Sequence, residues 1–131
     1  MGARDLRDLE RIVGAHGRFG HREHVELAWT YLGRYRLEQA TDAMSAAVRH
    51  LAGEHGMPDR YHETLTRSWV RLVDVHRRDS DARSFDEFIA ANSGLLHRHL
   101  LERHYSRDLI AGHGARAEWT EPDLRPLPGV R

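Results

Sequence analysis

The stretch that decides the fold is HREHVELAWTYLGRYRLEQATDAMSAAVRHLA, residues 21–52. Its apolar residues return every three or four positions, the period of a helix with one buried face. The first stripe, in residues 21–33, consists of His21, His24, Val25, Ala28, Trp29 and Leu32. The second stripe, in residues 37–52, consists of Leu37, Ala40, Met44, Ala47, Val48 and Leu51. The sequence therefore predicts two amphipathic helices that contribute to one core.

Helical patterns continue on both sides of this stretch. We expect a short helix over residues 6–13, a long one over residues 60–77, and shorter ones that begin near Phe85 and Leu95. No segment alternates apolar and polar residues for long enough to predict a strand. The prediction is an all-α, single-domain helical bundle over residues 1–131. Residues from about 115 to 131 are expected to form an irregular, extended C-terminal tail that packs on the bundle.

The composition narrows the classes of function. The chain has 131 residues and no cysteine, which excludes disulfides, thiolate zinc sites and cysteine nucleophiles. Basic and acidic residues number 20 each, and the resulting zero net charge does not favour nucleic acid as a partner. No apolar run approaches the ~20 residues that span a bilayer, and the charged N-terminus lacks the apolar core of a signal peptide. We therefore expect a cytoplasmic protein with no membrane partner.

Three of the eleven histidines have apolar neighbours on their helices. His21 and His24 lie on one inward stripe, and His62 lies on the stripe that contains Trp69 and Val73. Short connections favour an up-down-up course for the three central helices, which would bring all three histidines to one end of the bundle. Burial and a helix N-terminus both favour neutral imidazole, the form that binds metals. We expect these histidines to hold a divalent transition metal (Cu, Fe or Zn), among which the sequence does not choose.

Further residues are candidates for proton transfer and for binding a small-molecule substrate. Glu63 and Tyr105 are the expected catalytic acid–base groups, although Glu63 could equally form an ion pair within its own helix. The substrate-binding candidates are Trp29, Tyr61, Thr66, Trp69 and Arg116. The aromatic residues could instead belong to the core, and Thr66 could bond back to its own helix. Arg116 could clamp a substrate carboxylate, or it could fasten the tail through a salt bridge.

Three strings in this sequence resemble a family of small bacterial proteins that is itself uncharacterised. The strings are FGHREHVELAW (residues 19–29), YHETLT (residues 61–66) and ARAEWTEPDLRPLP (residues 115–128). The resemblance covers most of the chain, from residue 19 to residue 128. It implies that the family pattern includes His21, His24, Trp29, Tyr61, His62, Glu63 and Thr66. It supplies no activity.

Three hypotheses about function follow. The first is a small metal-dependent enzyme that holds one ion with His21, His24 and His62 and acts on a small metabolite. The second is a metal-free lyase, isomerase or hydrolase in which His62 and Glu63 are the acid and the base. The third is a non-catalytic interaction module, which could form a homodimer through exposed apolar residues.

Overall fold

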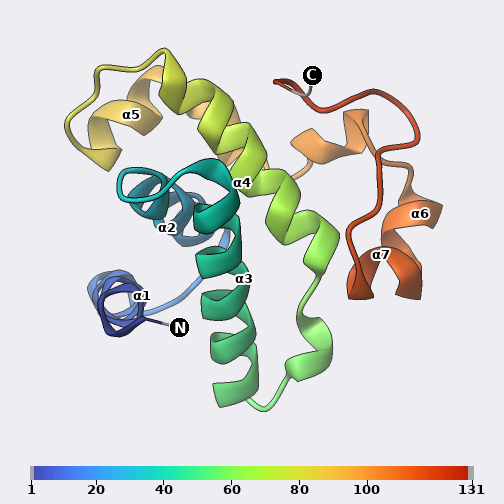
Figure 1. Ribbon diagram of the computed structural model, residues 1–131, viewed down its shortest axis with the longest axis horizontal. Coiled ribbons are helices and arrows are strands. Elements are labelled where there is room, and N and C mark those ends of the chain that lie inside the picture. The colour runs from blue at the N-terminus through green and yellow to red at the C-terminus, as the bar shows by residue number, and fades with distance from the viewer. Residues whose placement is uncertain (1, 130–131) are drawn as a thin grey trace.

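A computed structural model describes residues 2–129 of the chain. In this part the backbone forms helices and no strand, so the all-α class predicted from the sequence is confirmed. The four longest helices are α1 (Ala3–His16), α2 (His21–Leu32), α3 (Leu37–Glu54) and α4 (Glu63–Arg78). They pack against one another and contribute most of the core (Figure 1). Within the described residues, no helix is both long enough and apolar enough to cross a membrane.

The remaining elements are short. They are η1 (Pro58–Arg60), α5 (Phe85–Ala91), η2 (Ser93–Leu96), η3 (Leu100–Arg103), α6 (Arg107–Ala111) and α7 (His113–Ala117). Figure 1 shows α6, α7 and the C-terminal segment on the side of α4 that faces away from α1. The single helix expected from Leu95 is instead two 3₁₀ turns, η2 and η3, separated by the exposed residues His97, Arg98 and His99. The sequence gives these exposed residues no apolar stripe, so burial does not favour a continuous α-helix there.

The core is centred on α2. Val25 and Ala28 of its predicted stripe are fully buried, but so are Leu27 and Tyr31 on other sides of the helix. This wider burial arises because α1, α3, α4 and α5 all pack against α2. On α3 the predicted residues Ala40, Met44 and Ala47 are buried, whereas Val48 and Leu51 remain partly exposed. The apolar face of α3 is therefore covered most completely in its middle, from Ala40 to Ala47.

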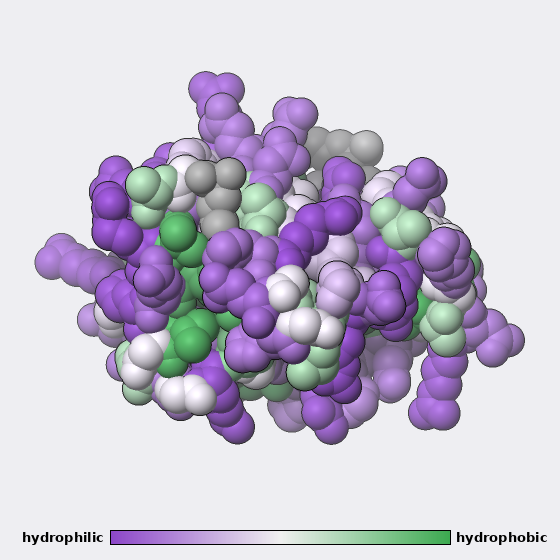
Figure 2. Space-filling model, turned by 90° about the horizontal axis from the view of Figure 1, so that it is seen from below, coloured by the Kyte–Doolittle hydropathy of each residue, from purple (hydrophilic) through white to green (hydrophobic). Residues whose placement is uncertain are grey.

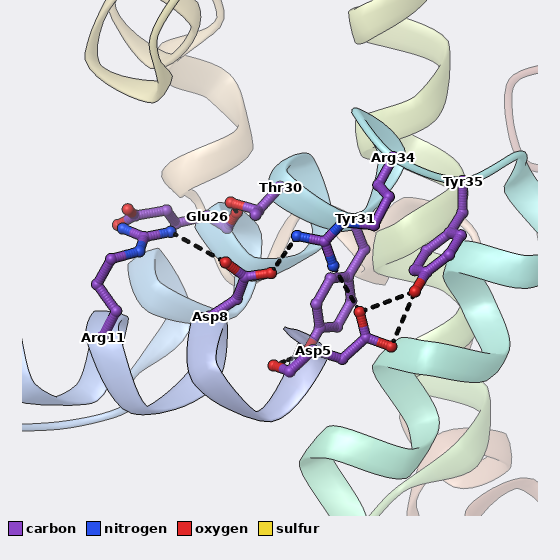
Figure 3. Close-up of polar contacts among 8 residues, drawn as sticks. All are labelled: Asp5, Asp8, Arg11, Glu26, Thr30, Tyr31, Arg34 and Tyr35. Atoms are coloured by element: carbon purple, nitrogen blue, oxygen red, sulfur yellow. Dashed lines mark hydrogen bonds and ion pairs between the residues drawn. The ribbon is translucent and has the colours of Figure 1, made fainter. Parts of the chain in front are cut away.

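A polar network that the sequence patterns did not suggest fastens α1 to the end of α2 (Figure 3). The Arg34 guanidinium donates to the carboxylates of Asp5 and Asp8 at 2.6 and 2.5 Å. The Tyr35 hydroxyl donates to the Asp5 carboxylate at 3.0 Å, and the Tyr31 hydroxyl donates to the Asp5 backbone carbonyl at 2.8 Å. Burial and the neighbouring carboxylates raise the pKa of Tyr31, which keeps its hydroxyl a donor. Each buried polar group of the network thus has a partner.

Candidate functional site

The His62 side chain caps α4. Its Nδ1 accepts a hydrogen bond from the backbone N–H of Leu65 at 3.1 Å, as an N-cap side chain does. Its Nε2 lies 2.9 Å from the Ile110 carbonyl oxygen, to which it must donate. Burial lowers the pKa of His62, in agreement with a neutral ring in which both nitrogens are used by the backbone. The ring therefore has no free nitrogen for a metal or for acid–base catalysis in this conformation.

His21 and His24 lie elsewhere along the bundle. The His21 ring packs edge-on against Trp69, with 4.3 Å between ring centroids, and its Nε2 donates to the Leu95 carbonyl oxygen at 2.8 Å. The Nε2 atom of His24 is buried and has no hydrogen-bond partner in the structure. Burial, together with the charge that His21 can carry, lowers the pKa of His24 to about 4. His24 is therefore neutral at physiological pH.

The three histidines do not converge as the sequence-based prediction requires. Trp69, the neighbour of His21, lies seven residues after His62, about 10 Å further along α4 at the rise of an α-helix. The offset has a simple cause, because α3 has 18 residues and α2 only 12. The chain runs back past the start of α2 before α4 begins. Among residues 2–129, no group of three His, Cys, Asp or Glu side chains is arranged to hold a metal ion.

Four further candidates are packed into the core or hold the tail. Trp69 is 4% exposed and Thr66 is 3% exposed. Trp29 packs on Phe85 and lies beneath the guanidinium of Arg77, 4.6 Å from its ring centroid. Tyr105 is buried, and its hydroxyl donates to the Thr120 carbonyl oxygen at 2.6 Å. Tyr105 therefore fastens the C-terminal segment and does not face a cavity with Glu63.

Two other predicted residues, Tyr61 and Arg116, do meet, at a cleft of about 460 Å³ between η1, α3 and α7. The residues that line this cleft are Arg49, Pro58, Asp59, Tyr61, His113, Arg116 and Ala117. They are brought together by the turn after α3, which places η1 beside α7. We take this cleft as the candidate functional site.

Arg116 reaches the cleft from α7 and is held by the backbone of η1. Its Nη1 donates to the carbonyl oxygens of Asp59, Arg60 and Tyr61 at 3.2, 3.3 and 3.4 Å. Neither of the two roles expected from the sequence describes this arrangement fully. Arg116 does fasten the chain, but through neutral carbonyl groups and not through a salt bridge. Its positive charge is therefore not paired with a carboxylate in the described part of the chain.

Tyr61 and Arg49 also line the cleft, and both contact Glu63, which does not line it. The Tyr61 hydroxyl donates to the Glu63 carboxylate, and the Arg49 guanidinium lies 4.3 Å from the centroid of the Tyr61 ring. Glu63 also lies 3.7 Å from Arg49 and 3.7 Å from Arg67, so the intrahelical ion pair that the sequence allowed is present. Burial, and then the hydrogen bond to Glu63, raise the pKa of Tyr61. The phenol is thus a donor at neutral pH.

Thr64 attaches the C-terminal segment to α4 beside this cleft. Its hydroxyl donates to the Glu118 carbonyl oxygen at 2.9 Å and accepts from the Thr120 backbone N–H at 3.1 Å. The strings YHETLT and ARAEWT, which begin 54 residues apart in the sequence, are therefore adjacent in the structure. This attachment positions α7, and with it Arg116, against η1.

Sequence reasoning missed Arg49 and His113 as residues of the site. Arg49 lies between Val48 and Leu51 of the α3 stripe but on the exposed side of the helix, where it is one of many solvated arginines. His113 lies after Gly112 in a segment without periodicity, and it is exposed. Of the residues that line the cleft, Tyr61 and Arg116 were the two that the sequence signalled, each within one of the quoted strings.

Comparisons with family models, with curated proteins and with solved structures find no match for this chain. The resemblance of the three strings to an uncharacterised bacterial family stays a prediction.

Proposed function

We propose that this protein binds a small organic anion in the cleft between η1, α3 and α7. The observation that carries the proposal is the state of Arg116, a guanidinium held by carbonyl oxygens at the wall of the cleft. Among residues 2–129 its hydrogen bonds are made by Nη1 alone, which leaves Nε and Nη2 without a protein partner. Nε and Nη2 lie along one edge of the planar guanidinium, and their two N–H groups match the two oxygens of a carboxylate or a phosphate.

The other lining residues set the character of the ligand. Arg49 and His113 add positive or potentially positive groups, and the Tyr61 ring provides an apolar surface. The carboxylate of Asp59 also lines the cleft, and it would repel an anionic group placed directly against it. This combination favours a small metabolite that has one acidic group to bind Arg116. A hydroxyl or amine group on the same molecule could donate a hydrogen bond to Asp59.

Thermal stability in the presence of defined probes tests the proposal. The probes are succinate, citrate, inorganic phosphate and glycerol phosphate, each at matched ionic strength. We expect at least one of them to raise the melting temperature in a concentration-dependent way, because a ligand that binds only the folded state stabilises it. Comparing the carboxylate probes with the phosphate probes identifies the anionic group that the cleft prefers.

Two matched variants make the test specific to the cleft. Arg116→Gln keeps a donor for the carbonyl oxygens of η1 but removes the charge, and it should abolish the response to the probe. Arg103→Gln removes an exposed arginine outside the cleft and should respond like the wild type. A wild-type protein that responds to no probe, or an Arg116→Gln variant that responds normally, would refute the proposal.

The two enzyme hypotheses stay predictions from the sequence. A metal-dependent reaction through His21, His24 and His62, with Cu, Fe or Zn, has no support from the arrangement of those side chains. For a metal-free reaction, His62 is a poor candidate because both of its ring nitrogens are bonded to the backbone and it does not line the cleft. Tyr61 lines the cleft and donates to Glu63, so this pair is the better candidate for proton transfer. Binding of an anion is common to such a reaction and to a non-catalytic role.

A further inference from the structure

The C-terminal half of α3 carries an apolar face that the rest of the bundle leaves partly uncovered. Two grooves of about 460 and 450 Å³ lie on either side of Leu51, which lines both. Apolar residues of the first groove are Phe19, Val48, Leu51, Ala52, Met57 and Tyr61. Those of the second groove are Leu6, Leu9, Val13 and Leu51. Figure 2 shows apolar side chains gathered in one patch on this face of the molecule, where α1 and α3 lie.

Several of these residues keep part of their surface exposed. Met57 is 45% exposed, and Leu6, Val13, Val48 and Leu51 are each partly exposed. A contiguous exposed apolar patch of this kind marks an interaction surface more often than scattered apolar residues do. The face needs a partner with an apolar surface of similar shape.

The charges at the rims of the two grooves are opposite. The charged groups that line the first groove are Arg18, Arg60 and, when protonated, His55. Those that line the second groove are Glu10, Glu54 and, when protonated, His50. Arg18 has an intramolecular partner in Glu23 at 3.8 Å, and Glu54 has one in His50 at 2.9 Å. Within residues 2–129, Glu10 and Arg60 form no ion pair, so both are available to a partner.

We propose that this face binds a second copy of the same chain and forms a twofold homodimer. In a twofold interface both copies contribute the same surface. If the axis runs between the basic groove and the acidic groove, the basic groove of each copy lies against the acidic groove of the other. An axis near Leu51 places the first groove of one copy over the second groove of the other. Each Glu10 then faces the Arg60 of the partner subunit, and this contact occurs twice.

The apolar part of the interface is tested by Leu51→Asp. Sedimentation velocity and light scattering over a concentration series should show a monomer–dimer equilibrium for the wild type. In the variant the dissociation constant should rise about 100-fold, because a charge is buried at the centre of the interface. Leu124→Asp, at a residue that is 55% exposed and lies outside both grooves, should dimerise like the wild type. A wild type that stays monomeric up to its solubility limit overturns the proposal.

Charge reversal tests how the two copies are aligned in the dimer. It changes only exposed residues, so the fold is not put at risk. Glu10→Arg and Arg60→Glu should each weaken self-association about tenfold, because like charges then face each other twice. When the two variants are mixed, a dimer that contains one copy of each has an arginine facing a glutamate at both contacts. This heterodimer should therefore form. Native mass spectrometry of the mixture, with the two variants labelled by different isotopes, measures this directly. Failure of the mixture to form heterodimers in preference to either homodimer excludes the interface, and a circular dichroism melt of each variant confirms that it is folded.

Discussion

At the scale of single residues, three histidines with the same sequence environment have three different roles. His62 uses both ring nitrogens for the backbone, as an N-cap and as a donor to the Ile110 carbonyl oxygen. His21 uses Nε2 for the Leu95 carbonyl oxygen and packs its ring on Trp69. His24 has a buried Nε2 with no hydrogen-bond partner among residues 2–129. The difference lies in which polar groups from distant segments reach each ring.

We predict that His24 makes the protein acid-sensitive. The folded-state pKa of about 4 lies below the ordinary value of 6.5, so the unfolded chain binds more protons between these two values. His24 therefore does not lower the free energy of unfolding above about pH 6.5. As the pH falls from 6.5 toward 4, protonation of His24 lowers the free energy of unfolding by about 3 kcal/mol in total. Urea unfolding at several pH values measures it.

The His24→Leu variant isolates this contribution from that of the other titrating groups. Between pH 7 and pH 4 it should lose about 3 kcal/mol less of its free energy of unfolding than the wild type does. His97→Leu, which changes an exposed histidine, should follow the wild-type curve. Parallel curves for His24→Leu and the wild type would contradict the assignment.

A second residue-scale prediction concerns the cap of α4. His62→Ala removes both an N-cap acceptor and the donor to Ile110, and we expect a loss of about 2 kcal/mol in the free energy of unfolding. His62→Asn keeps a side-chain acceptor for the cap and should lose about half as much. Urea denaturation measures both variants. Equal losses in the two variants would show that the cap contributes little.

At the scale of elements, α1 is held on the bundle by a specific polar network as well as by its apolar face. Arg34 joins two carboxylates of α1, and Asp5 receives further hydrogen bonds from the Tyr35 hydroxyl. Asp5 is 5% exposed, and these partners supply the hydrogen bonds that its buried carboxylate would otherwise make to water. The network therefore fixes the position of α1 along α2, which apolar contacts alone specify less strictly.

We predict that Arg34→Ala destabilises the protein by about 3 kcal/mol, because it leaves the Asp5 carboxylate buried without its ion pair. Arg34→Lys should recover only part of this loss, since an ammonium group cannot bridge two carboxylates with the geometry of a guanidinium. Chemical denaturation followed by circular dichroism measures the three proteins. A lysine variant as stable as the wild type would show that charge alone is sufficient.

At the scale of the whole molecule, the C-terminal segment completes the candidate site. Arg116 belongs to α7, and the segment directly after α7 is bonded to Thr64 of α4 and to Tyr105. The cleft therefore exists only when a segment more than 50 residues away in sequence is attached to the start of α4. Local order in this segment should control ligand binding.

We predict that Thr64→Val, which is similar in shape but lacks the hydroxyl, loosens the C-terminal segment. It removes one donor and one acceptor, so hydrogen–deuterium exchange at the Thr120 amide should accelerate at least tenfold, equivalent to about 1.4 kcal/mol. Exchange in the core of α2 should change much less. Uniform acceleration across the protein would indicate global destabilisation instead of local release.

The fold class and the central helices followed from the sequence. The period of apolar residues depends on the geometry of one helix at a time, so the stripes of α3 and α4 could be assigned without knowing what covers them. The same reasoning underestimated α2, where Leu27 and Tyr31 are buried by helices on other sides, and α4, where Val70 is buried outside the predicted stripe. It also overestimated the burial of Val48 and Leu51, because a stripe does not show how far along its length a neighbour reaches.

What only the tertiary structure decided is how the helices are offset and which polar groups then meet. A shift of two helical turns separates His21 from His62, and it replaces a predicted three-histidine cluster with backbone hydrogen bonds. The same long-range packing brings Arg49, Tyr61 and Arg116 to one cleft. The sequence by itself determined which residues prefer helix and burial, because those preferences are local. The contacts that make a site depend on distances of a few ångströms between distant segments, and these are set by the packing of the whole chain.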